Sequence, residues 1–297
     1  MRLPQFHSQP DPAKDYDSAT QRLETLKAQD GPDIIQPCRL QFLSHGHKTD
    51  QAIIFFHGYT ACPDQFLTLG NLFFERGYNV LIPRMPLHGL NDRLTPIHAN
   101  LKAEALVALA DEAIDIAGGL GKTIKVMGLS MGGVLASWAA QQRRDVERAM
   151  IISPALGFQS LSYRWTRLIM WWALISPNSF RWWDPNAEAN LPVPPYGYPR
   201  FSTRALAQIL RLGFSVRDEA KKRPPAAKQV IMVTNANDQM VDQRPAAELV
   251  DRWRQRGATI RTCQFPANQQ LFHDLIDPSQ PSERTSIVYP ILIDLMV

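Results

Sequence analysis

The sequence predicts an α/β fold with a mostly parallel central sheet and helices on both faces. Short apolar runs alternate with helix-like segments along most of the 297 residues, a pattern typical of repeated strand–helix–strand units. These runs are apolar at consecutive positions, as expected for strands that are buried on both faces. A tryptophan-rich segment interrupts the alternation between residues 155 and 223. We interpret this segment as an inserted helical cap.

This pattern divides the chain into four parts. Residues 1–37 are expected to form an extended, proline-containing arm followed by a helix. The core is predicted in two pieces, 38–154 and 224–297, which flank the cap at 155–223. The length suits one α/β domain with an insertion, and a hydrophobic content of 45% is that of an ordinary globular protein.

Each core element is predicted from its local pattern. Apolar runs indicate strands, and apolar side chains three or four residues apart indicate helices. The first two strands are expected to pair as a hairpin, because only a polar turn separates them. Glycines directly after the second and third helices are expected to end them. The predicted elements are a helix at 15–29, strands at 38–43 and 52–56, a helix at 66–76, a strand at 80–82, a helix at 101–117, a strand at 123–127, a helix at 134–140, and strands at 148–152, 228–234 and 259–265.

The segment Gly128-Leu129-Ser130-Met131-Gly132 lies between a strand-like and a helix-like run. A strand, G-x-S-x-G, helix order is typical of a nucleophile elbow, which exposes the serine hydroxyl at a helix N-terminus. Glycines flank the serine because the turn is too tight for side chains. The alternative is a glycine-rich turn with an idle serine. We expect Ser130 to be a nucleophile.

Candidates for the acid and the base follow in the order that this elbow requires. Asp238 comes directly after the strand-like run 228–234 and is the first choice for the acid, and Asp242 is the second choice. His273 follows the last strand-like run, and no other histidine lies C-terminal to residue 98. Together these residues predict a Ser130–His273–Asp238 triad.

Two backbone amides are candidates for an oxyanion hole, the pair of donors that stabilises the negative oxygen of an acyl-transfer intermediate. One is the amide of Met131, directly after the serine. The other is the amide of Tyr59, in the loop after an earlier strand. His57 precedes the serine in the chain, so we expect it to shape this loop rather than act as the base.

At these segments the chain resembles the α/β-hydrolases, specifically the carboxylesterase, monoacylglycerol-lipase and lysophospholipase branch. The resemblance covers about residues 38–155 and 225–297, but not the cap. The turn at 86–90 departs from the Gly-His-Gly-like turn that is common in these relatives. The motifs that carry the resemblance are Phe55-Phe56-His57-Gly58-Tyr59-Thr60, Gly77-Tyr78-Asn79-Val80-Leu81-Ile82-Pro83, Gly128-Leu129-Ser130-Met131-Gly132-Gly133, Asn237-Asp238 with Val241-Asp242, and His273-Asp274. The resemblance implies the α/β-hydrolase fold and serine-dependent ester hydrolysis.

The predicted cap contains five of the seven tryptophans. A cap over the serine excludes water and shapes the acyl pocket. We therefore expect an apolar acyl site whose substrate-binding residues are Trp165, Trp171, Trp172, Trp182 and Trp183. The alternative is that these side chains only pack the cap onto the core.

Charge and composition limit the partners. The formal net charge is +4, and the basic runs at 221–223 and 252–256 are expected to be solvated helix faces. They lack the interleaved aromatics of a nucleic-acid site, so we expect a small-molecule ester as the partner and no nucleic acid. No apolar segment is long enough to span a bilayer. Weak contact with anionic lipid surfaces remains open, and the oligomeric state is not predicted.

The cysteines and histidines do not form a recognisable framework. Cys38, Cys62 and Cys263 give no disulfide framework, and Cys38 and Cys263 lie in predicted strands, where free buried thiols are common. Without an apolar signal segment near the N-terminus, we expect a cytoplasmic location. His45 and His47 lack a third ligand nearby in the sequence, so no metal is expected. The predicted chemistry requires no cofactor.

Other functions use the same machinery and remain open. An aminopeptidase, a thioesterase or a carbon–carbon bond hydrolase would use the same triad. An aminopeptidase would need acidic cap residues to hold the substrate amine, and Glu188 is one candidate. A non-catalytic binding protein on this scaffold is a further alternative.

Overall fold

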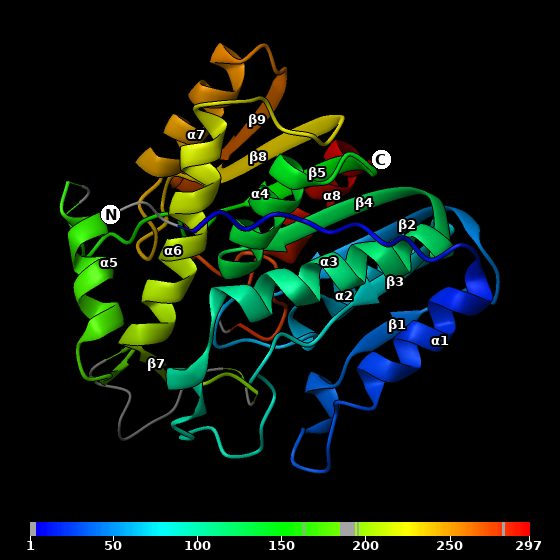
Figure 1. The fold of residues 1–297 in the computed structure, drawn as a ribbon, viewed down its shortest axis with the longest axis horizontal. Coiled ribbons are helices and arrows are strands. Elements are labelled where there is room, and N and C mark those ends of the chain that lie inside the picture. Colours follow the sequence, from blue (N-terminus) through cyan, green and yellow to red (C-terminus); the bar gives the residue numbers. More distant parts are fainter. Residues whose placement is uncertain (1–3, 163, 185–193, 195, 281–282) are drawn as a thin grey trace.

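The computed structural model describes residues 4–162, 164–184, 194, 196–280 and 283–297. Within them the main sheet has the order β1-β3-β2-β4-β5-β8-β9 (Figure 1). Neighbouring strands pair in parallel, except that β1 runs antiparallel to β3. The strands are β1 (Gln41–Leu43), β2 (Thr49–Phe56), β3 (Tyr78–Ile82), β4 (Gly121–Leu129), β5 (Val146–Ile152), β8 (Gln229–Asn235) and β9 (Ile260–Phe265). The predicted mostly parallel sheet is confirmed.

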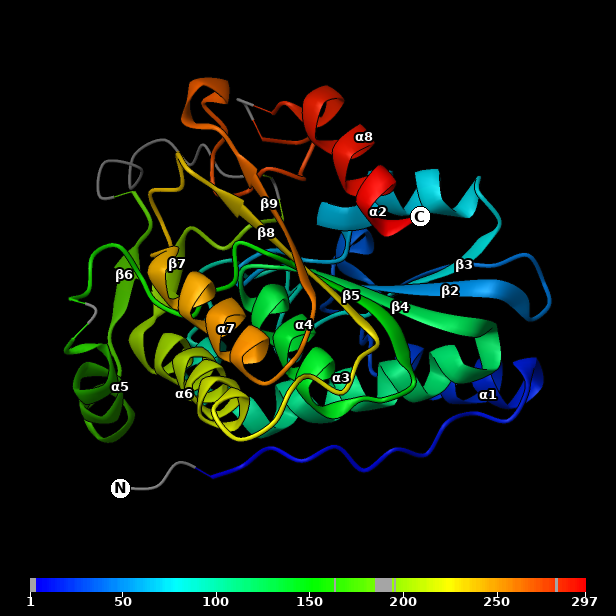
Figure 2. The ribbon, with the colours of Figure 1, turned by 90° about the horizontal axis from the view of Figure 1, so that it is seen from above.

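Helices cover both faces of the sheet (Figure 2). The described helices are α1 (Tyr16–Lys27), α3 (Ala103–Leu120), α4 (Met131–Gln142), α6 (Thr203–Ala220) and α7 (Arg244–Gln255) on one face, and α2 (Asp64–Phe74) and α8 (Thr285–Met296) on the other. Strand β2 shows why both layers are needed, since its alternate residues supply two separate cores. Ile54 and Phe56 pack toward α3 and α4, whereas Ile53 and Phe55 pack toward α2.

The predicted hairpin between the first two strands is wrong, because β3 lies between β1 and β2. β2 is apolar and fully buried from Ala52 to Phe56 and takes an interior position, whereas the half-buried β1 takes the edge. Asn79 of β3 fixes this arrangement. Its side chain accepts a hydrogen bond from the His45 amide (2.9 Å) and donates one to the His47 carbonyl (2.8 Å). The polar turn after β1 is therefore bound to β3.

Helix α3 continues through the glycine pair that was expected to end it. A Cβ atom at Gly119 would lie 2.2 Å from the Asp15 carbonyl oxygen and 2.7 Å from Ala19 Cβ. Gly119 thus allows α1 to approach α3 closely. The glycine marks helix–helix packing, and the helix ends one residue later, at Leu120.

The segment between β5 and β8 contains α5 (Thr166–Ile175), β6 (Phe180–Trp182), β7 (Arg200–Ser202) and α6. β6 and β7 form a small antiparallel sheet. Helix α6 packs on α3, α4 and α7 and is part of the helical layer. Helix α5 contacts α6 and lies at the periphery of the molecule (Figures 1 and 2). None of the described helices is long and apolar enough to cross a membrane.

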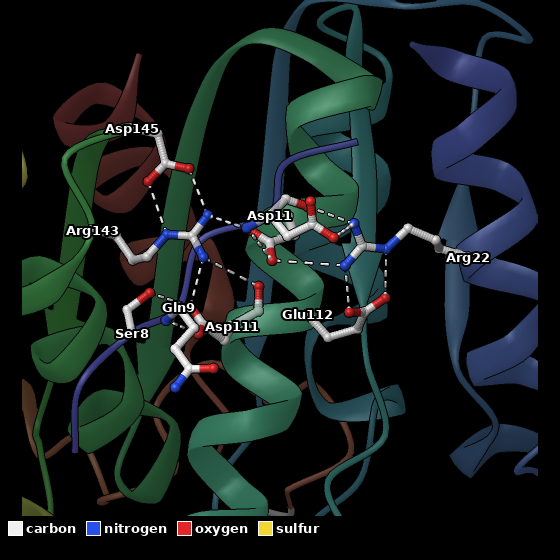
Figure 3. A network of polar contacts seen from close by, with 9 residues as sticks. Ser8, Gln9, Asp11, Arg22, Asp111, Glu112, Arg143 and Asp145 are labelled. Carbon is white, nitrogen blue, oxygen red and sulfur yellow. Dashed lines mark hydrogen bonds and ion pairs between the residues drawn. The ribbon is translucent and has the colours of Figure 1, made fainter. Parts of the chain in front are cut away.

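The N-terminal arm runs along the helical layer and is fixed by a buried charge network (Figure 3). Ser8 Oγ and the Gln9 amide both donate to the Asp111 carboxylate of α3. Asp111 also binds Arg143, which is fully buried at the end of α4. Asp145 binds the same guanidinium (2.6 Å), so the arm, α3 and α4 are joined through one cation.

Cys38 and Cys62 form a disulfide, so the expectation that the cysteines give no disulfide framework is wrong, as is that of a free thiol at Cys38. Cys38 ends a 3₁₀ turn (Gln36–Cys38) rather than lying in a strand. The two cysteines are 24 positions apart in the sequence, and the fold brings the N-terminal segment against the loop after β2. The partly buried Cys263 stays a free thiol.

Candidate active site

Ser130 lies at the sharp turn between β4 and α4, with a backbone φ of 58°. The flanking glycines are required by space. A Cβ atom at Gly128 would lie 2.0 Å from the Gly132 carbonyl oxygen, and one at Gly132 would lie 1.8 Å from the Phe56 carbonyl oxygen. The left-handed conformation of a non-glycine residue stores strain that such surroundings must hold in place. The turn therefore has the geometry predicted from the G-x-S-x-G pattern.

Neighbouring strands hold this turn in place. The Ser130 amide donates to the Ile152 carbonyl of β5 (3.0 Å), and the Ser130 carbonyl accepts from the amides of Val134 and Ala155 (3.0 Å each). The backbone of Ser130 is thus tied to both elements beside it, while its side chain lies in the wall of a cavity.

Asp238 and His273 form a hydrogen bond, 2.7 Å between Oδ2 and Nδ1. Asp238 follows β8, and its Oδ1 accepts from the amides of Met240 (2.9 Å) and Val241 (3.1 Å). Gln243 donates to its Oδ2. The carboxylate is fully buried and is oriented by these donors toward the imidazole.

The second choice for the acid, Asp242, has a different partner. Its carboxylate forms an ion pair with Arg244 (2.6 Å between Oδ2 and Nη2), which begins α7. Asp242 also accepts from the Arg244 amide (3.0 Å). The described contacts of its carboxylate are therefore with the start of α7 rather than with His273.

The two partners of the imidazole–carboxylate pair shift each other's pKa. Burial disfavours the charged form of His273, but the charge and hydrogen bond of Asp238 outweigh burial and raise its pKa above the ordinary value. For Asp238, burial alone would raise the pKa, yet His273 and the backbone donors bring it below the usual value. Asp238 is thus ionised near neutral pH and stabilises the cationic imidazole.

The amides of Tyr59 and Met131 have no hydrogen-bond acceptor among the described residues. Buried N–H groups are normally paired, so these two are available to another acceptor. The loop that carries Tyr59 is tightly held. His57 Nδ1 donates to the Gly58 carbonyl (2.8 Å), and its Nε2 accepts from the Met85 amide (3.1 Å). His57 therefore helps to shape this loop, as expected, and the histidine that binds Asp238 is His273.

A polar chain that the sequence did not reveal joins this loop to the histidine loop. The Gly58 amide donates to Gln65 Oε1 (2.8 Å), and Gln65 Nε2 donates to Asp274 (2.9 Å). Gln280 donates to the other oxygen of Asp274 (2.9 Å). Burial and the nearby Asp277 charge raise the pKa of Asp274 well above the usual carboxyl range. The only available sequence signal was the position of Asp274 directly after His273.

Ser130 and His273 line the same cavity, which has a volume of about 270 Å³. Its exposed wall is mainly apolar. The lining includes Leu129, Phe158, Trp183, Leu206, Ile209, Met240 and Phe272, together with Tyr59, Gln65, Asp274 and Gln280 at its polar part. An apolar cavity with a few convergent polar groups is typical of a small-molecule site.

Of the five cap tryptophans, Trp183 lines this cavity and its indole donates to Thr60 Oγ1 (3.0 Å). Trp165, Trp171, Trp172 and Trp182 are not among the described residues that line it, and substrate contact by these four stays a prediction. Trp165 and Trp172 are exposed on α5, since that helix turns its other face to α6. Trp171 packs on the core. Tryptophan content alone did not distinguish these environments.

Two further expectations concern acidic and metal-binding groups. Glu188 lies outside the described residues. No group of three or more potential metal ligands occurs in the part of the chain that the structure describes. Asp274 is the acidic residue among the described residues that line the cavity.

The comparisons with known proteins agree with this architecture. The model of the alpha/beta hydrolase family matches residues 53–284. No curated protein sequence matches the chain at a significant level.

Solved structures with the same fold include several hydrolases. One, reported for the metagenome-derived lipolytic enzymes LipS and LipT, is 18% identical with a TM-score of 0.65 and covers 89% of this chain and 98% of its own. The monoacylglycerol lipase of Paleococcus ferrophilus is 15% identical (TM-score 0.65), with 86% and 97% covered. The monoglyceride lipase of Saccharomyces cerevisiae is 14% identical (TM-score 0.63), with 87% and 90% covered.

Proposed function

The chain belongs to the alpha/beta hydrolase family, and on that premise we propose that it hydrolyses carboxylic esters with apolar acyl chains through a Ser130–His273–Asp238 triad. The observation that carries the proposal is the 2.7 Å hydrogen bond between Asp238 and His273, with His273 and the elbow residue Ser130 in the wall of one cavity. The solved structures of lipases with this fold support the choice of bond, since they are named for ester cleavage.

In this mechanism Ser130 Oγ attacks the ester carbonyl carbon, and Nε2 of His273 takes the hydroxyl proton. Asp238 holds the Nδ1–H side of the ring and stabilises the imidazolium. The free amides of Tyr59 and Met131 donate to the oxyanion. His273 then gives its proton to the departing alcohol, and water hydrolyses the acyl-enzyme by the same route. These steps are proton transfers and acyl transfer, for which the named groups suffice.

The substrate class follows from the cavity. Its mainly apolar wall and volume of about 270 Å³ suit a short or medium acyl chain, and each buried methylene contributes about 0.8 kcal/mol.

The division of the chain into a core (38–154 and 224–297) and an inserted segment (155–223) is also part of this proposal. Helix α6 belongs to the inserted segment in sequence but packs into the helical layer of the core.

Replacement of the nucleophile tests the proposal. Ser130→Ala should lower kcat/KM for p-nitrophenyl butyrate by several orders of magnitude and abolish labelling by a fluorophosphonate probe, with the unfolding midpoint unchanged. The exposed Ser160→Ala is the matched control and should keep both. Wild-type turnover by folded Ser130→Ala would refute the triad.

A series of substrates distinguishes ester hydrolysis from hydrolysis of the other candidate bonds. The value of kcat/KM should rise from acetate through roughly four to ten acyl carbons and then fall when the cavity is full. Aminoacyl naphthylamides and acyl thioesters are assayed in parallel. Faster cleavage of either class would replace the ester assignment while leaving the triad in place, and a fully inactive but folded protein would favour a binding role.

A further inference from the structure

Helix α5 presents an apolar stripe to the outside of the molecule. The side chains of Trp165, Leu168, Trp172 and Ile175 are 58%, 58%, 69% and 83% exposed. Their spacing of three, four and three residues places them on one helix face. We call these four residues the α5 stripe. No described part of the chain covers these four side chains.

The opposite face of α5 explains why the stripe stays outside. Thr166 and Met170 are buried, and the helix packs on α6. The face of α5 that packs on α6 is therefore the one that contributes to the core. The stripe lies on the opposite face and is not part of the core. The other large exposed apolar side chains among the described residues are Leu94 and Val297, together with Met240 and Phe272, which line the cavity of the candidate active site. A contiguous stripe of this kind marks an interaction surface.

The charged residues near the stripe indicate the kind of partner that it can bind. Residues 155–184 contain three arginines, Arg164, Arg167 and Arg181, and one acidic residue, Asp184. Arg167 is paired with Asp218 of α6 (3.2 Å). Arg164 and Arg181 are exposed. Arg204 lies at the end of α5, where it donates to the Ser176 carbonyl (2.8 Å). The exposed apolar stripe thus has a cationic surrounding.

We propose that the α5 stripe docks on an anionic lipid bilayer surface. Amphipathic helices with tryptophan and leucine on one face and arginine around it lie in the bilayer interface, where indole rings are favoured and cations attract anionic headgroups. A second copy of the chain is a poorer occupant. A two-fold contact between two stripes would bring Arg164 and Arg181 of one copy close to the same cations of the other. The proposal goes beyond ester hydrolysis, since docking does not require Ser130.

Sedimentation of the full chain with vesicles tests this surface. It should bind vesicles of equal parts phosphatidylcholine and phosphatidylglycerol and bind pure phosphatidylcholine more weakly, with binding reduced by salt. Leu168→Ser/Trp172→Ser should weaken binding by about tenfold or more. Arg164→Gln/Arg181→Gln should weaken binding to the anionic vesicles by roughly fivefold per arginine.

Matched variants keep the result interpretable. Val297→Ser removes an equally exposed apolar side chain elsewhere and should bind like the wild type, as should Ser130→Ala. All stripe variants should hydrolyse a soluble short ester at the wild-type rate, which shows that they fold. Absence of wild-type binding to anionic vesicles, or unchanged binding by the stripe variants, would overturn the proposal. A dimer that the stripe substitutions dissociate without vesicles would assign the stripe to a second copy instead.

Discussion

At the residue scale, local backbone contacts decide which carboxylate faces the histidine. Asp238 and Asp242 are both buried and lie in one loop. The amides of Met240 and Val241 hold one oxygen of Asp238 and leave the other for His273. Arg244 binds Asp242 instead. The two carboxylates therefore have separate partners, and their substitutions should have separate consequences.

Asp238→Asn should lower kcat/KM by about three to four orders of magnitude, because an amide neither holds the required tautomer nor stabilises the imidazolium. Asp242→Asn is the matched control and should keep near-wild-type turnover, with its effect confined to the start of α7. Steady-state kinetics on a soluble ester measures both. The assignment fails if Asp242→Asn is the more damaging of the two.

The pH profile checks the same contact independently. Protonated His273 cannot accept the serine proton, so kcat/KM should fall as the pH drops through its pKa. Because the Asp238 carboxylate raises this pKa above the ordinary histidine value of about 6.5, the acidic limb should lie above that value. In Asp238→Asn the residual activity should show the limb at lower pH. A limb that does not move would mean that Asp238 has only a structural role.

At the scale of elements, sequence patterns predict what depends on neighbours in the chain. Ser130 was predictable because an elbow needs small residues at fixed offsets, and β2 was predictable because a strand covered on both faces is apolar throughout. Partners distant in sequence were not predictable. The turn after β1 is bound by the side chain of Asn79 in β3. Gln65 is one polar residue on a helix until the fold brings Asp274 to it. Trp172 and Trp183 are likewise indistinguishable until α5 packs on α6.

The charge network around Arg143 links several elements on one face of the sheet (Figure 3). The guanidinium is fully buried and binds Asp111, Asp115 and Asp145, each at 2.6 Å. Burial would lower the pKa of Arg143, but these carboxylates outweigh it and raise the pKa. Arg22 supplies a second cation, bound to Glu112. Removing Arg143 would therefore leave several neighbouring carboxylates without compensation.

Arg143→Ala should lower the free energy of unfolding by about 3–5 kcal/mol, because it leaves the carboxylates that bind Arg143 without a counter-charge in a buried environment. Urea denaturation followed by fluorescence measures the change. Lys122→Ala removes the cation of an exposed ion pair with Asp50 and should leave the midpoint where it is. If Arg143→Ala does not fold, Arg143→Lys, which keeps the charge but not the geometry, should be intermediate. Wild-type stability of either Arg143 variant would contradict this account.

At the scale of the whole molecule, the Cys38–Cys62 disulfide joins parts that are distant in sequence. Cys62 follows the loop that carries Tyr59, and both cysteines pack with Ile34 and Tyr196. Tyr196 in turn donates to Asp277, beyond β9. The N-terminal segment, the loop of the proposed oxyanion hole and the C-terminal part of the core therefore meet at this bridge. Disulfides are rare in the cytosol, so the cytoplasmic location expected from the sequence stays a prediction that the bridge weakens.

Removing the bridge should destabilise the protein and disturb the Tyr59 loop. For cysteines 24 positions apart, the chain-entropy model gives about 3–4 kcal/mol of the free energy of unfolding. Cys38→Ala/Cys62→Ala should show this loss in urea denaturation, together with a lower kcat, because the loop that holds the oxyanion donor is less constrained. Cys263→Ala is the control and should change neither quantity. Thiol titration of the unfolded protein should find one reactive cysteine before reduction and three after it. Three thiols without reductant would refute the bridge, and with it the argument that this contact holds the two ends of the fold against the loop at Tyr59.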